Sequence, residues 1–300
     1  MPELADFYPG YESRFTETSA GRIFARIGGS GSPVLLLHGY PQTNVMWHRM
    51  APLLAKEHML VIADLPGYGQ SDAPEAAPDH SPYTKRAMAR AMVELMNQLG
   101  HQRFAVVGHD RGGRVGYRLA LDHPQRVTRL SVLDIVPTWE MWAKMDAKRA
   151  MKVFHWTFLA QPYPLPEMLI GKAPVEYMEW KMLAWNGSDT NSIFDPRAMD
   201  HYRAFFSQPA RLHATCEDYR AGQSTDVAID DADVKAGRKI ECPLLALWGA
   251  RGIPAAGESP LDVWKRWATK AEGQAIDCGH FLAEENPDDT LKTLLPFLRG

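Results

Sequence analysis

Short apolar segments alternate with longer amphipathic segments over much of the chain. The apolar segments are rich in leucine and β-branched residues and predict strands at Val34–Leu37, Met59–Ala63, Phe104–Val107, Leu130–Leu133, Leu244–Trp248 and Gln274–Ile276. They are continuously apolar, as expected where helices cover both faces of a parallel sheet. Helical spacing of apolar residues is clearest at Lys85–Leu99 and Gly113–Asp122, with weaker signals at Leu261–Trp267 and Thr290–Leu298. The pattern therefore predicts an α/β fold, with a mostly parallel sheet flanked by helices.

The alternation stops after Pro137 and resumes before Leu244. The segment between is rich in Trp, Met, Tyr and Phe, contains a proline-dense part from Gln161 to Pro166, and shows no strand pattern. We interpret residues 138–226 as a helical cap inserted into one core formed by residues 1–137 and 227–300. A separate all-helical domain is the alternative, but the return of strand–helix alternation after the insertion favours the cap.

Composition and charge exclude several classes of protein. The chain has 300 residues, 45% hydrophobic and 23% charged, which is typical of globular proteins. Its net charge of −3 gives no basic field, so we expect no nucleic-acid partner. The apolar runs are too short to span a bilayer, and the N-terminus lacks the features of a secretory signal. Cys216, Cys242 and Cys278 are odd in number and far apart, which predicts reduced thiols in a cytoplasmic protein.

A candidate nucleophile follows the strand that ends at Val107. The sequence Gly108-His109-Asp110-Arg111-Gly112-Gly113 places small residues on both sides of Asp110, as a sharp strand-to-helix turn requires. Serine is the common residue there. A carboxylate can instead attack a saturated carbon and form an alkyl ester that water can cleave. Asp110 therefore predicts displacement of a halide or opening of an epoxide, with a simple helix N-cap as the structural alternative.

The partners of such a nucleophile are predicted from chain order. His280 follows the last predicted strand and is the candidate base that activates water against the Asp110 ester. The loop after Leu244–Trp248 has no carboxylate, whereas Asp134 directly follows the strand ending at Leu133, so we assign Asp134 to orient His280. The backbone amides of Tyr40 and Arg111 are the candidate oxyanion donors.

With these residues assembled, the chain resembles α/β-hydrolases with an aspartate nucleophile. The resemblance covers nearly the full length and rests on His38-Gly39-Tyr40-Pro41, the segment 64–72 (DLPGYGQSD), Gly108 to Arg114, and Gly279-His280. Epoxide hydrolases and haloalkane dehalogenases of this branch usually carry tryptophan after the nucleophile, where this chain has Arg111. Asp110-Arg111-Gly112-Gly113-Arg114 is most similar to the fluoroacetate dehalogenases. This family implies an α/β-hydrolase fold and hydrolysis of fluoroacetate to glycolate.

Two arginines and three cap residues complete the predicted site. Arg111 and Arg114 are three apart on the predicted helix, share a face, and suit a small carboxylate better than a neutral substrate. The resemblance also implies that His155, Trp156 and Tyr219 bind the departing halide. Composition alone does not distinguish these three from the other aromatic residues of the cap.

The leading hypothesis is thus dehalogenation of a small haloacid, with no cofactor and no metal, because the histidines lack a metal-ligand spacing. An epoxide hydrolase or a haloalkane dehalogenase with the same three catalytic residues is the enzymatic alternative. A non-catalytic ligand receptor on the same fold is the alternative from another class. The resemblance further implies a homodimer.

Overall fold

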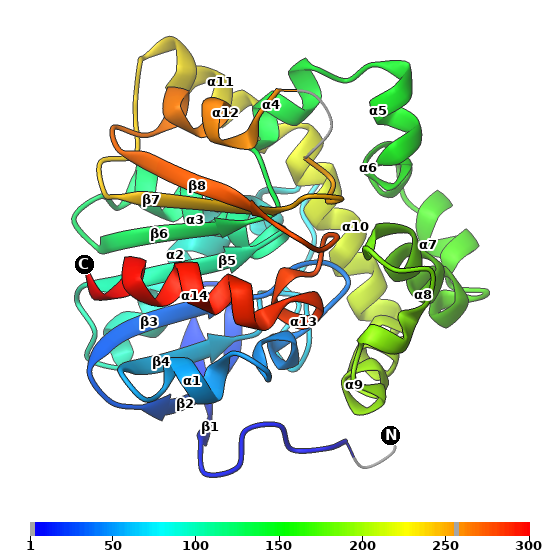
Figure 1. Cartoon of the computed structure of the whole chain (residues 1–300). Helices are drawn as coiled ribbons and strands as arrows, with labels where there is room; N and C mark the ends of the chain where they lie inside the picture. The colour runs from blue at the N-terminus through cyan, green and yellow to red at the C-terminus, as the bar shows by residue number, and fades with distance from the viewer. Residues whose placement is uncertain (1–3, 255–257) are drawn as a thin grey trace.

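The computed structural model describes residues 4–254 and 258–300, and its centre is a sheet of eight strands (Figure 1). The strands are β1 (Glu12–Thr18), β2 (Gly21–Gly29), β3 (Ser32–Leu37), β4 (His58–Ala63), β5 (Phe104–His109), β6 (Val127–Leu133), β7 (Leu244–Gly249) and β8 (Ala271–Ile276). Their order in the sheet is β1-β2-β4-β3-β5-β6-β7-β8. Only β2 runs against its neighbours β1 and β4, and every other pair of neighbours after β4 is parallel. The predicted α/β fold with a mostly parallel sheet is confirmed.

All six predicted strands are present, each within one or a few residues of its predicted bounds. The sequence pattern missed β1 and β2, at one edge of the sheet. Most side chains of β1 are exposed, because only one strand pairs with it and no helix covers it fully. A strand of this kind lacks the continuous apolar run by which the central strands were found.

Helices cover both faces of the sheet. The helices α2 (Lys85–Gln98) and α3 (Arg111–Asp122) lie behind it in Figure 1, and α1 (Ala51–Leu54) and α14 (Pro287–Arg299) lie in front. The other helices outside the segment between β6 and β7 are η1 (Asn44–Trp47), η2 (Ser81–Tyr83), α12 (Pro260–Trp267) and α13 (Leu282–Glu285). Along residues 4–254 and 258–300, no helix is both long and apolar enough to cross a membrane. The three cysteines are free.

The chain between β6 and β7 forms a series of helices joined by loops. They are α4 (Thr138–Ala143), α5 (Ala147–Lys152), α6 (Phe154–Leu159), α7 (Leu165–Ile170), α8 (Pro174–Trp185), η3 (Asn191–Ile193), α9 (Pro196–Phe206), α10 (Pro209–Gln223) and α11 (Thr225–Lys235). Figure 1 shows α6 to α9 together at one side of the sheet, with α10 between them and the strands. These helices cover the side of the sheet where the functional residues lie.

The predicted end of the cap, residue 226, falls just inside α11. This helix packs on the core, because Asp230 and Asp233 pair with Arg118 of α3 at 2.7 and 2.6 Å. Asp230 and Asp233 are thus acidic residues buried against arginine. A sequence pattern shows that a residue is charged, but it does not show where its partner lies.

Candidate active site

Asp110 lies on a tight turn between β5 and α3. Its backbone angles are φ 45° and ψ −114°, which L residues rarely adopt. The flanking glycines are required: a Cβ on Gly108 would lie 2.5 Å from the carbonyl oxygen of Gly112, and one on Gly112 would lie 2.4 Å from that of Leu37. Backbone strain of this kind is concentrated at functional turns. The strand, turn and helix thus have the geometry of a nucleophile elbow, with the Asp110 carboxylate at its apex.

The Asp110 carboxylate is buried and held in one orientation. The backbone amide of Tyr40, in the loop after β3, donates to Oδ1 at 3.0 Å. The other oxygen, Oδ2, lies 4.0 Å from Nε2 of His280. Burial favours the neutral acid, but the neighbouring basic groups His280 and Arg114 outweigh it and lower the pKa of Asp110. The group is therefore an ionised carboxylate near neutral pH.

His280 and Asp134 form a buried pair beside the elbow. Nδ1 of His280 lies 2.5 Å from Oδ2 of Asp134, and both side chains are inaccessible to solvent. The backbone amides of Gly249 and Ile253 donate to Asp134 at 2.9 and 3.0 Å, which satisfies a carboxylate placed among apolar residues. Because Nδ1 bonds to a carboxylate, the proton of the neutral imidazole belongs on Nδ1. Nε2 then faces Asp110 as a free base, with no hydrogen-bond partner of its own among the described residues.

Trp185 of α8 contacts this pair from the cap, and sequence reasoning did not single it out. Its carbonyl oxygen accepts from the His280 amide at 2.9 Å, and its ring lies 5.5 Å from the imidazole. Its indole Nε1 is buried without a partner among the residues described. No local signal distinguishes this tryptophan from Trp142 or Trp180, since only the docking of the cap brings it to His280.

Arg111, the first residue of α3, is already ion-paired. Its Nε and Nη2 atoms donate to the two carboxylate oxygens of Asp218 at 2.8 and 2.6 Å. The pKa of Arg111 is raised, because the Asp218 carboxylate outweighs the effect of burial. Asp218 belongs to α10 of the cap and was not predicted from the sequence. In the sequence, only its position next to Tyr219 could have pointed to Asp218.

Arg114 lies one turn further along α3 and has a different environment. Its Nη1 donates to the carbonyl oxygen of Val136 at 3.0 Å and to Oγ1 of Thr138 at 3.1 Å. It forms no ion pair with a carboxylate of residues 4–254 or 258–300 at salt-bridge distance, and its Nε is buried without a partner there. The guanidinium lies 4.5 Å from the ring centroid of Trp156. Burial lowers the pKa of Arg114, although Asp110 opposes this.

The three cap residues predicted to bind halide are brought together over the elbow. The ring of Tyr219 lies 5.5 Å from that of His155 and 6.1 Å from that of Trp156. The guanidinium of Arg111 lies 4.1 Å from the Tyr219 ring centroid. Burial, helped by the charges of Lys181 and Arg111, lowers the pKa of His155 well below its ordinary value, so this imidazole is neutral.

Several polar atoms in this region have no partner in the described chain. Nδ1 of His155, the Tyr219 hydroxyl and Nε2 of His280 are all buried in this way. Buried polar groups are normally hydrogen-bonded, so such a cluster is typical of a place where a ligand or water supplies the missing bonds. The described residues contain no group of three or more histidine, cysteine or acidic side chains placed to hold a metal ion. What the region offers is a carboxylate, a base, arginines and neutral donors.

The fold and this elbow define a hydrolase class, and the family comparison agrees: residues 32–287 match the family model for the alpha/beta hydrolase fold. The chain belongs to the α/β-hydrolase family. It is 43% identical to fluoroacetate dehalogenase from Burkholderia sp., over 97% of this chain and 95% of that protein. It is also 31% identical to soluble epoxide hydrolase from Corynebacterium sp. strain C12, over 90% of this chain and 91% of that one.

A solved structure agrees over nearly the full length. An α/β hydrolase from Nostoc sp. PCC 7120 superposes with a TM-score of 0.94 and 47% identity, covering 97% of this chain and 99% of that one. The chain is therefore an α/β-hydrolase enzyme related to a fluoroacetate dehalogenase and to epoxide hydrolases.

Proposed function

We propose that the enzyme hydrolyses the carbon–halogen bond of small haloacetates, fluoroacetate among them, to give glycolate and halide. One observation carries the proposal: near the elbow carboxylate Asp110, Arg114 is a buried cation with no carboxylate at ion-pair distance among the described residues. A small anionic substrate would compensate that charge, whereas a neutral alkyl halide or epoxide would not. The similarity to the Burkholderia fluoroacetate dehalogenase supports the same substrate class.

In the first step, Arg111 and Arg114 hold the substrate carboxylate, so that the α-carbon is presented to Asp110. An oxygen of Asp110 forms a bond to the α-carbon while the carbon–halogen bond breaks. The bonding electron pair leaves with the halide, and the product on the enzyme is an alkyl ester of Asp110. The lowered pKa of Asp110 supports this role, since only the ionised carboxylate is nucleophilic.

Fluoride is strongly basic and strongly hydrated, so its departure needs hydrogen-bond donors aimed at it. Three neutral donors are available in the cap: the imidazole of His155, the indole of Trp156 and the hydroxyl of Tyr219. Two of them have buried atoms with no other partner in the described chain. Because its lowered pKa keeps the imidazole of His155 neutral, the ring donates a hydrogen bond through one N–H and carries no second proton that Asp110 could take.

In the second step, Nε2 of His280 takes a proton from water, and the resulting hydroxide attacks the ester carbonyl carbon of Asp110. The amides of Tyr40 and Arg111 stabilise the oxyanion, as the existing bond from Tyr40 to Asp110 suggests. Asp134 stabilises the imidazolium that forms. The bond between the Asp110 carbonyl carbon and the alkyl oxygen then breaks, and His280 gives its proton to that oxygen, so that glycolate leaves as an alcohol. One water oxygen remains in Asp110, and the second proton of that water passes to solvent as the carboxylate is restored.

The proposal is tested by comparing three substrates. We expect fluoride release from fluoroacetate and little or no turnover of styrene oxide or 1-bromobutane. A single turnover in ¹⁸O water distinguishes the mechanism: the label must enter Asp110 first, leaving unlabelled glycolate. Epoxide turnover without fluoride release would favour the epoxide-hydrolase alternative, and label found directly in the first glycolate would contradict the ester intermediate.

A further inference from the structure

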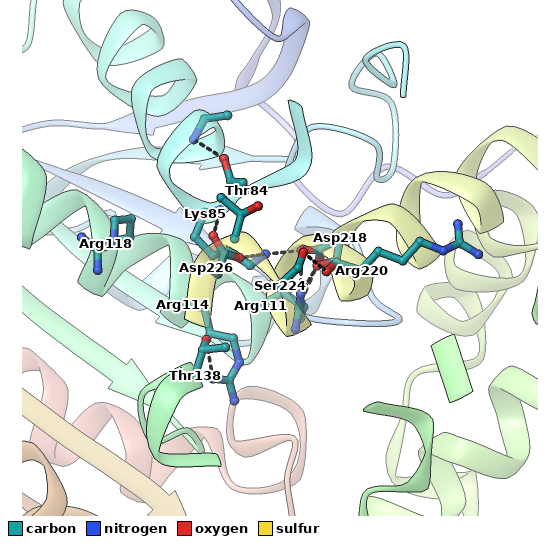
Figure 2. A network of polar contacts seen from close by, with 12 residues as sticks. Thr84, Lys85, Arg111, Arg114, Arg118, Thr138, Asp218, Arg220, Ser224 and Asp226 are labelled. Atoms are coloured by element: carbon teal, nitrogen blue, oxygen red, sulfur yellow. Dashed lines mark hydrogen bonds and ion pairs between the residues drawn. The ribbon is translucent and has the colours of Figure 1, made fainter. Parts of the chain in front are cut away.

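Arg111 forms all its side-chain hydrogen bonds within the described residues with one residue of the cap, Asp218. Figure 2 shows the Asp218 side chain next to Arg111, with dashed lines for the contacts between them. Nε of Arg111 donates to Oδ2 at 2.8 Å, Nη2 donates to Oδ1 at 2.6 Å, and Nη2 also donates to the Asp218 carbonyl oxygen at 2.8 Å. The neighbouring Tyr219 lies under the guanidinium plane. The remaining nitrogen, Nη1, forms no hydrogen bond with any residue that the structure describes.

Asp218 is itself anchored by the core. The Tyr68 hydroxyl donates to it at 2.8 Å, and the Lys85 ammonium also contacts it. Lys85 begins α2 and is bound on its other side by Asp226, whose Oδ1 accepts from the Lys85 amide at 2.9 Å (Figure 2). Asp218 is completely buried, and the charges of Arg111 and Lys85 hold its pKa far below the ordinary value despite that burial. It is therefore a permanent anion with a fixed position.

The two arginines of α3 are consequently unequal. The charge of Arg111 is compensated by Asp218, and two of its nitrogens are occupied. Arg114 donates only to a carbonyl and a hydroxyl oxygen among the described residues, so no carboxylate there is hydrogen-bonded to it, and Asp110 acts on it only at longer range. A guanidinium presents its donors in a rigid plane, so fixing one edge also fixes the direction of the remaining nitrogen.

We propose that Asp218 is a positioning residue, which holds Arg111 so that its Nη1 edge is directed to the substrate carboxylate while Arg114 supplies the attracting charge. This inference rests on the proposed function. Because Asp218 lies on α10, Arg111 is positioned only when that cap helix is docked on the core. Carboxylate recognition and cap docking thus depend on the same ion pair.

The test is equilibrium binding of glycolate, measured by calorimetry, with glycolamide as the neutral analogue. Asp218→Asn keeps the shape and removes the charge. We expect its Kd for glycolate to rise about ten- to a hundredfold, as for loss of a charge-assisted contact, with little change for glycolamide. Asp218→Glu restores the charge and should fall between Asp218→Asn and the wild type.

Asp233→Asn is the matched control, because it removes a buried carboxylate from Arg118 of the same helix. It should bind glycolate like the wild type. The proposal is overturned if Asp218→Asn binds glycolate with the wild-type Kd, or if Asp233→Asn loses as much affinity for glycolate as Asp218→Asn does. It is also overturned if Asp218→Asn raises the Kd values for glycolate and glycolamide by the same factor.

Two further outcomes are covered by the same design. If Asp218→Asn does not fold, Asp218→Glu carries the test, and an unchanged Kd in that variant overturns the proposal. Binding needs no turnover, so fluoride release by the wild type tests the proposed function separately. Failure of the wild type to bind glycolate would also overturn the role of Asp218.

Discussion

Nδ1 of His280 and Oδ2 of Asp134 lie 2.5 Å apart, although 146 positions separate the two residues in the chain. The bond fixes the imidazole with Nε2 facing Asp110 at 4.0 Å. Asp134 does not depend on His280 alone, because two backbone amides also bind its carboxylate. A change at Asp134 can therefore alter the imidazole without dismantling the loop that carries it.

Asp134→Asn should slow ester hydrolysis much more than ester formation. The amide cannot stabilise an imidazolium, and in the serine-protease template the equivalent change costs about 10⁴-fold in kcat. We expect a burst of one equivalent of fluoride per site, followed by very slow turnover. Rapid-quench measurement of fluoride checks this. If the variant loses the fluoride burst as well as steady-state fluoride release, Asp134 acts in ester formation, which would contradict its assignment to ester hydrolysis.

His280→Asn should trap the intermediate. Without the base, the ester of Asp110 forms and is not hydrolysed. After incubation with fluoroacetate, the peptide containing Asp110 should gain the mass of a carboxymethyl group in peptide mass spectrometry. The wild type treated in parallel is the control, and an unmodified peptide after long incubation of the variant is the contrary result.

Arg114→Met should weaken substrate binding severely, because it removes a buried charge to which no carboxylate of the described chain is hydrogen-bonded. The expected effect is a rise in KM for fluoroacetate of about 10- to 150-fold, typical of a lost hydrogen bond to a charged group. Arg114→Lys keeps the charge and should be intermediate. Steady-state fluoride release measures both, and equal KM values for Arg114→Met and the wild type would remove the argument for an acidic substrate.

We expect the buried residue Glu284 to make the stability of the protein depend on pH. It is fully buried, it accepts from the Tyr202 hydroxyl at 3.0 Å, and burial raises its pKa from 4.5 to about 8. Between these values the folded state holds a proton that the unfolded state has lost, so the contribution of Glu284 to stability falls as pH rises.

Glu284→Gln mimics the protonated acid and should flatten this slope. Thermal unfolding of the variant and the wild type across the same pH range gives the comparison. Equal slopes of Tm against pH would show that Glu284 does not titrate there.

The expected homodimer has a candidate surface on the cap. Met168 and Leu169 of α7 and Trp180 of α8 are 52%, 49% and 55% exposed, and a subunit interface would cover apolar side chains of this kind. Leu169→Glu should shift the protein toward a monomer in light scattering coupled to size exclusion. Leu53→Glu, at a similarly exposed leucine on α1, is the control and should leave the assembly unchanged. A wild type that is monomeric at all concentrations would contradict the prediction.

Local composition was enough to predict the centre of the fold. Buried parallel strands must be continuously apolar, and Val34–Leu37 and Phe104–Val107 carry that signature in their own residues. The elbow was equally local, because the close backbone approach at Gly108 and Gly112 excludes a side chain and so leaves a sequence motif. The strands β1 and β2 were missed, because β1 is mostly exposed and β2 is buried only near its middle, so neither carries a long continuous apolar run.

The sequence by itself determined the chemistry available to this enzyme: a carboxylate at a strained turn, a histidine after the last strand, and two arginines on one helix face. Only the tertiary structure decided which partners these groups have: it pairs Arg111 with Asp218 and leaves Arg114 without a carboxylate at ion-pair distance among the described residues. It also brought Trp185 to His280. The reason is that covalent spacing fixes backbone turns and faces locally, whereas ion pairs and ring contacts form between residues that only folding brings together.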